Sequence, residues 1–180
     1  LRSMPMFQRC RRRLAWLAPN IVLNIVAASV IAMYEDTLQS VIALAVFLPI
    51  VSDMSGCSGN QAVAVSIREL TLGLIRPTEF VRIVWKEGVL GICNGMILGV
   101  LLGTIAALWK DNVYLGLVVG GALALNTLLS VLLGGCVPLL LKKFKVDPAL
   151  ASGPILTTAT DMCGFFLVLN LASAVLAKLA

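Results

Sequence analysis

The chain has 180 residues, of which 59% are hydrophobic and only 13% are charged, whereas a soluble domain carries about 25% charged residues. This composition excludes an ordinary globular protein and predicts an all-α integral membrane protein, whose net charge of +5 reflects topology. Histidine is absent, which argues against zinc, nickel or copper held by imidazole and against a histidine general base.

Residues 1–13 form a predicted basic cytoplasmic juxtamembrane segment, and residues 14–180 form a predicted membrane domain. The first predicted span covers about residues 14–33, with Trp16 as an anchor at the membrane interface. Asn20 and Asn24 lie one turn apart in this span, and we expect them to bond across helices. The arginines of the basic segment suit anionic headgroups; they are Arg2, Arg9, Arg11, Arg12 and Arg13.

The second predicted span, about residues 38–67, turns polar at mid-bilayer depth over residues 52–61. A polar backbone at that depth must be buried in protein or line a watery cavity. Because the span is long and contains Pro49, we expect a kink or an unwound middle. Placing the charged carboxylate of Asp53 at that depth costs about 3 kcal/mol or more unless it is paired. A hard cation is its natural partner. The alternative is that Gly56 and Gly59 only allow close helix packing.

Residues 68–87 form a predicted connector, with a short interfacial helix that starts near Pro77 and Thr78. The third predicted span covers about residues 88–108. Its glycines recur every four residues and predict a packing ridge on one face; they are Gly91, Gly95, Gly99 and Gly103. The fourth span covers about 113–141, with Asn126 and Ser130 as a polar face, and the fifth covers about 150–177.

The basic residues support this alternation of five spans. With the N-terminus in the cytoplasm, the inner segments are 1–13, 68–87 and 142–147. Of the 14 lysines and arginines of the chain, all but Lys110 and Lys178 lie in these segments. The positive-inside rule therefore predicts five spans with a cytoplasmic N-terminus. We expect the membrane to be the cell's inner (plasma) membrane.

Asp161 is a second carboxylate near the centre of a predicted span. Thr157 lies one turn before it on the same helix face. Two midplane carboxylates with neighbouring oxygen donors describe a site for a divalent hard cation, and oxygen ligands without histidine favour partly hydrated Mg²⁺. The alternative for Asp161 is a protonated acid that bonds to a neighbouring helix.

Several segments resemble the transmembrane domain of the MgtE family of magnesium channels and transporters. They are Val30–Leu38 (V-I-A-M-Y-E-D-T-L), the L-P-I-V and G-C-S-G-N-Q-A segments, I-R-E-L, and Val146–Asp161 (V-D-P-A-L-A-S-G-P-I-L-T-T-A-T-D). The resemblance implies five helices per subunit, a homodimer, and an ion path at the dimer interface lined by spans two and five. It places binding of hydrated Mg²⁺ on Asp161, the Thr157 carbonyl, the region from Asp53 to Gly56, and Asn60.

Three departures from the family pattern stand out. The usual segment is closer to G-x-G-G-N-T-G-N-Q, so Asp53 adds a carboxylate where the family commonly has glycine. Gly153 stands where an asparagine is common before the proline of span five. The regulatory cytoplasmic N domain and the CBS pair have no counterpart in these residues, which leaves the family's magnesium-sensing gate open to question.

We therefore predict a transport protein and not an enzyme: a homodimeric pore for magnesium, lined by spans two and five. A coupled exchanger or exporter of the same fold is the first alternative. An intramembrane aspartyl protease is a second, since two membrane aspartates can share a proton, but their sequence contexts do not match such enzymes. A structural membrane subunit is the third. The sequence leaves import or export, gating, and Mg²⁺ against Co²⁺, Mn²⁺ or Ca²⁺ undecided.

Overall fold

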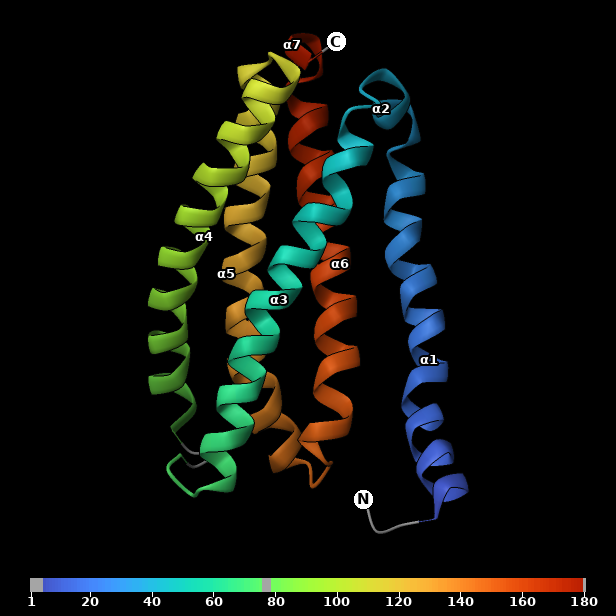
Figure 1. The fold of residues 1–180 in the computed structure, drawn as a ribbon, viewed down its shortest axis with the longest axis vertical. Coiled ribbons are helices and arrows are strands. Elements are labelled where there is room, and N and C mark those ends of the chain that lie inside the picture. The colour runs from blue at the N-terminus through green and yellow to red at the C-terminus, as the bar shows by residue number, and fades with distance from the viewer. Residues whose placement is uncertain (1–4, 76–78, 180) are drawn as a thin grey trace.

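The computed structural model describes residues 5–75 and 79–179, which form five long helices and two short ones (Figure 1). Arg2, Pro77 and Thr78 lie outside the described residues, and so do the side chains of Arg9, Arg12, Arg13 and Trp16. The long helices are α1 (Met6–Met33), α3 (Leu44–Thr71), α4 (Phe80–Lys110), α5 (Val113–Lys143) and α6 (Pro148–Ala174). The short ones are α2 (Glu35–Ser40) and α7 (Leu176–Leu179).

Three of these helices, α4, α5 and α6, are long and apolar enough to cross a membrane. In α1 the apolar part is shorter and covers Leu17–Met33, and α3 carries the polar stretch of residues 52–61. The helical architecture and these apolar helices agree with the predicted all-α integral membrane class.

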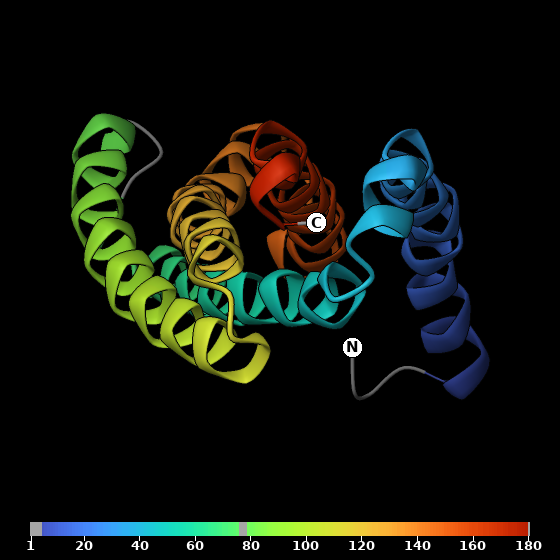
Figure 2. The same ribbon diagram turned by 90° about the horizontal axis from the view of Figure 1, so that it is seen from above.

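The long helices run up and down in alternation, and α5 is the central one (Figures 1 and 2). It packs against α3, α4 and α6. Accordingly, 61% of the most apolar 18-residue stretch of α5 is buried, compared with 28% of the corresponding stretch of α4. Local sequence sets where α5 and α6 begin, because Asn112 and Asp147 cap them by accepting from the backbone N–H of Leu115 and Ala149.

Helix α1 stands at the outer edge of the bundle and packs against α6 (Figure 2). Two polar contacts join α6 to α1 and to Tyr34, the residue that follows α1. The Thr158 hydroxyl donates to Asn20 Oδ1 at 3.0 Å, and Asn170 Nδ2 donates to the Tyr34 hydroxyl at 3.2 Å. The predicted bond from Asn20 across helices is therefore confirmed, whereas Asn24 is exposed.

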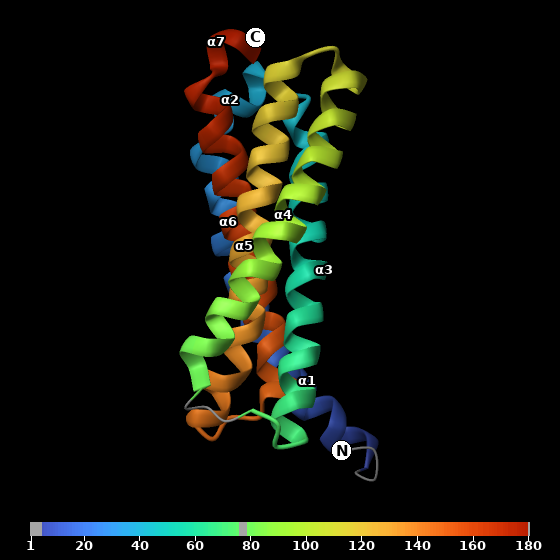
Figure 3. The same cartoon turned by 90° about the vertical axis from the view of Figure 1, so that its left-hand side faces the viewer.

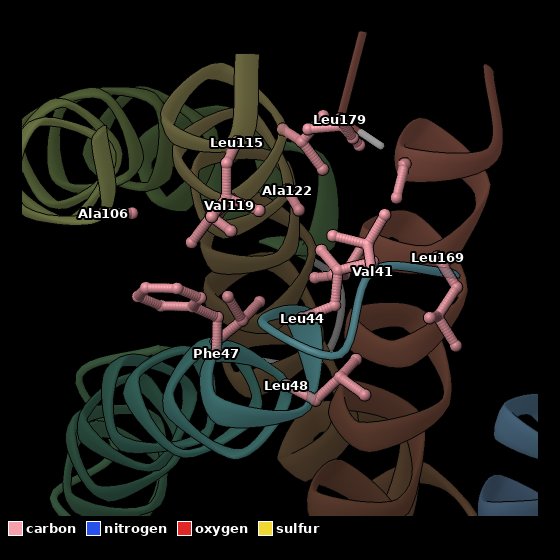
Figure 4. Packing of buried hydrophobic residues seen from close by; sticks show 14 of the residues in the cluster. Val41, Leu44, Phe47, Leu48, Ala106, Leu115, Val119, Ala122, Leu169 and Leu179 are labelled. Atoms are coloured by element: carbon pink, nitrogen blue, oxygen red, sulfur yellow. The ribbon is translucent and has the colours of Figure 1, made fainter. Parts of the chain in front are cut away.

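A hydrophobic cluster fills the end of the bundle near α2 and α7 (Figure 4). Phe47 of α3 is fully buried there, with its ring edge-on to Trp109 at a centroid distance of 5.9 Å. Helix α5 contributes Leu115, Val119 and Ala122 to the same cluster. In a bilayer such contacts stabilise through van der Waals packing, since lipid tails are as apolar as these side chains.

Helix α3 does not unwind in its middle, and this corrects the expectation for span two. It is continuous from Leu44 to Thr71 and includes Pro49. The proline removes a single backbone donor. Two serine hydroxyls of the polar stretch bond back within the helix, Ser55 to the Val51 carbonyl at 2.5 Å and Ser58 to the Met54 carbonyl at 3.2 Å. The chain changes direction earlier, in a turn at residues 41–43.

The connector before span three also differs from the prediction. Helix α4 starts at Phe80 and runs without a break to Lys110, so the expected interfacial helix and span three are one element. The glycine ridge is confirmed. A Cβ on Gly95 would lie 2.5 Å from the Ala124 carbonyl oxygen of α5, so only glycine allows this approach. Helices α4 and α5 pack against each other along the bundle (Figure 3).

Candidate functional site

A pocket of about 310 Å³ lies between α3 and α6 and contains both predicted membrane carboxylates. All five predicted site residues line it: Asp53, Gly56 and Asn60 from α3, and Thr157 and Asp161 from α6. The remaining lining residues are Pro49, Ser52, Cys57, Thr160 and Phe165.

Helical periodicity explains why these residues share the pocket. The α3 residues recur at intervals of three and four from Pro49 to Asn60, which places them on one stripe of the helix. The α6 residues follow the same rule from Thr157 to Phe165. The pocket forms where the two stripes face each other.

One side-chain hydrogen bond crosses the pocket. The Ser52 hydroxyl donates to the carboxylate of Asp161. Ser52 is buried and Asp161 is half-buried, whereas Asp53 is exposed on the surface of the single chain. Among the described side chains, neither aspartate forms an ion pair with a lysine or arginine. The negative charge of the pocket is therefore left without a protein counter-ion in this part of the chain.

Around the carboxylates the atoms that could act as metal ligands are mainly oxygens. The Thr160 hydroxyl donates to the Thr157 carbonyl at 2.9 Å, and the Thr157 hydroxyl donates to the Gly153 carbonyl at 2.8 Å. These contacts hold the threonine oxygens on the pocket side of α6. Oxygen donors of this kind suit a hard cation, whereas the Cys57 thiol in the lining is softer.

The volume and lining of the pocket can be compared with the size of a hydrated ion. Within residues 5–75 and 79–179, no cluster of three or more histidine, cysteine or acidic side chains could hold a metal ion directly. Six waters occupy roughly 180 Å³ at about 30 Å³ each, so a fully hydrated Mg²⁺ has room in about 310 Å³. The arrangement can bind a hydrated divalent cation by charge and by hydrogen bonds to its water.

Sequence reasoning did not select Ser52, Thr160 or Phe165 as site residues. The signal that finds Ser52 and Phe165 is helical spacing: Ser52 lies one turn before Gly56, and Phe165 lies one turn after Asp161. The Ser52 contact itself joins residues 109 positions apart, and no local pattern predicts it.

Comparison with known proteins matches the pocket helices to one family. The MgtE family profile, described as a divalent cation transporter, matches residues 48–171. The chain belongs to the MgtE family. The matched range includes every residue that lines the pocket, from Pro49 to Phe165.

Three curated MgtE proteins, each named magnesium transporter MgtE, are similar to the chain over most of its length. The Bacillus subtilis protein is 37% identical over 163 residues, which is 91% of this chain and 36% of the relative. The Enterococcus faecalis protein is 32% identical over 162 residues (90% and 36%), and the Thermus thermophilus protein is 33% identical over 165 residues (91% and 36%). The chain thus spans about a third of the length of these relatives.

Proposed function

We propose that this chain moves Mg²⁺ across the membrane through the pocket between α3 and α6. The observation that carries the proposal is that Asp53 and Asp161, from distant parts of the sequence, line one pocket large enough for a hydrated ion. The three relatives named magnesium transporters support the choice of ion. Family membership also favours transport over an intramembrane protease.

The functional unit we propose is a homodimer whose ion path follows the dimer interface. Asp53 and Thr157 are exposed on the single chain although they lie well inside α3 and α6. A carboxylate at that depth is costly when it faces lipid. A second copy that covers the open side of the pocket removes this cost and brings together two copies of each aspartate.

In the proposed topology all five long helices span the plasma membrane, with the N-terminus in the cytoplasm. The start of α1, the end of α3, the start of α4 and the α5–α6 connection lie at one end of the bundle (Figures 1 and 3). Lysines and arginines of the described residues at this end include Arg11, Arg68, Arg82, Lys142 and Lys143, and by the positive-inside rule this end is the proposed cytoplasmic face.

In this mechanism Asp161 and Asp53 attract the ion, while the hydroxyl, amide and carbonyl oxygens of Thr157, Asn60 and the backbone near Gly56 bond its water. Since Mg²⁺ gives up water reluctantly, contact through the hydration shell permits fast release. A divalent ion gains about 4.6 kcal/mol per 100 mV on moving inward. A passive channel can therefore import Mg²⁺ without a second energy source.

The test is Mg²⁺ uptake by the full chain in proteoliposomes. We expect Asp161→Ala to abolish uptake and Asp53→Ala to change the half-saturating concentration or the ion preference. Asp36→Ala, in α2 and outside the pocket, is the matched control and should behave as the wild type. Uptake by the Asp161 variant equal to that of the wild type would refute the proposed site. Dependence of uptake on a proton or Na⁺ gradient would instead indicate the exchanger.

A further inference from the structure

Behind the pocket, a single buried side chain joins the two helices that carry the aspartates. Asn126 of α5 is 0% exposed. Its Nδ2 donates to the Ser55 hydroxyl of α3 at 2.9 Å and to the Thr160 carbonyl of α6 at 3.1 Å. One amide group therefore bonds to both walls of the pocket at the same time.

These two contacts lie beside the carboxylates in sequence. Ser55 follows Asp53 by two residues, and Thr160 immediately precedes Asp161. A second residue of α5, one turn after Asn126, strengthens the α3 side: the Ser130 hydroxyl donates to the Ser55 carbonyl at 2.6 Å. The polar face predicted for the fourth span is thus a buried connection to the pocket helices.

The fit around Asn126 is tight on the α6 side. A Cβ on Gly164 would lie 2.7 Å from Asn126 Nδ2 and 3.7 Å from the Ser52 Cα. The amide reaches both helices because Gly164 has no side chain. A buried amide held by directional bonds in such a space fixes distances more narrowly than apolar packing does.

We propose that Asn126 is a positioning residue that sets the separation of Asp53 and Asp161 and thereby the ion preference of the site. This inference rests on the proposed transport function. Mg²⁺ requires near-ideal octahedral geometry, whereas Ca²⁺ accepts larger and more variable shells. A fixed distance between the carboxylates therefore favours the compact hydration shell of Mg²⁺, and a loosened distance reduces the difference between the two ions.

The test replaces Asn126 by leucine, which has similar volume and no donors, and measures Mg²⁺ uptake in proteoliposomes with and without competing Ca²⁺. We expect the half-saturating Mg²⁺ concentration to rise about tenfold and the preference for Mg²⁺ over Ca²⁺ to fall about tenfold, the size of one to two lost hydrogen bonds. The matched control is Ser66→Ala. It removes a buried bond between α3 and α5, from Ser66 to the Gly135 carbonyl at 3.2 Å, away from the pocket, and should leave the preference unchanged.

A folded Asn126→Leu variant with the wild-type ion preference overturns the inference, and so does an equal loss of preference in Ser66→Ala. If Asn126→Leu does not fold, Ser55→Ala removes the α3 acceptor of Asn126, together with the bond from Ser55 to the Val51 carbonyl within α3, and leaves the bond from Asn126 to Thr160 in place. It should shift the preference about threefold in the same direction, and an unshifted preference in that variant overturns the inference equally. A wild-type chain that takes up no Mg²⁺ refutes the proposed function and the inference together, whereas an active wild type separates the two.

Discussion

The approach of α3 to α5 gives a prediction whose size follows from the structure. At Gly59 a Cβ would meet the Ser130 hydroxyl, would lie 2.8 Å from the Ser130 carbonyl oxygen, and would lie 2.9 Å from Leu156 Cδ2. A backbone atom is among these neighbours, so Gly59→Ala must push α3 away from α5. The substitution also disturbs the bond from Ser130 to Ser55.

Overpacking of this kind costs up to about 3 kcal/mol. Alanine recovers about 1 kcal/mol through its higher helix propensity. The net loss of about 2 kcal/mol corresponds to a fall in Tm of roughly 4–8 °C for a chain of this size. Since Asn60 follows Gly59 and lines the pocket, the same shift should also lower Mg²⁺ uptake.

The assay is thermal unfolding of the detergent-purified chain, with Gly121→Ala as the matched control. A Cβ on Gly121 meets nothing within 4 Å, so this variant gains helix propensity without a clash and should keep or raise the Tm. If Gly59→Ala unfolds at or above the temperature of Gly121→Ala, the close contact between α3 and α5 is not as described and the reasoning fails.

Two further predictions concern single hydroxyl groups. Ser52→Ala removes the donor to Asp161 and should raise the half-saturating Mg²⁺ concentration about tenfold, because a hydrogen bond to a charged group contributes roughly 1.5–3 kcal/mol. The control Ser58→Ala lies on the same helix outside the pocket and should leave this concentration unchanged. Equal effects of the two substitutions would contradict the role of Ser52. Thr158→Val removes the hydroxyl that joins α6 to α1 and should weaken the packing of α1 by about 1 kcal/mol, which is measured as faster amide hydrogen exchange in α1. In the control Thr104→Val, the lost hydroxyl bonds only within its own helix, so hydrogen exchange in α1 should stay unchanged.

The membrane class, the approximate course of the five long helices and the residues that share each stripe follow from the amino-acid sequence alone. These features depend on local quantities: hydrophobicity over about 20 residues and a helical period of 3.6. Spacing alone places Asp53, Gly56 and Asn60 on one face of α3, and Thr157 and Asp161 on one face of α6. The glycine ridge of α4 was predictable for the same reason.

Which stripes meet depends on how the helices pack in three dimensions. The contacts from Ser52 to Asp161 and from Asn126 to Ser55 and Thr160 join residues far apart in the chain, and they depend on how whole helices pack. Packing also gives partners to polar side chains of α3 that the sequence alone leaves facing lipid: Ser52 donates to Asp161, and Ser55 accepts from Asn126.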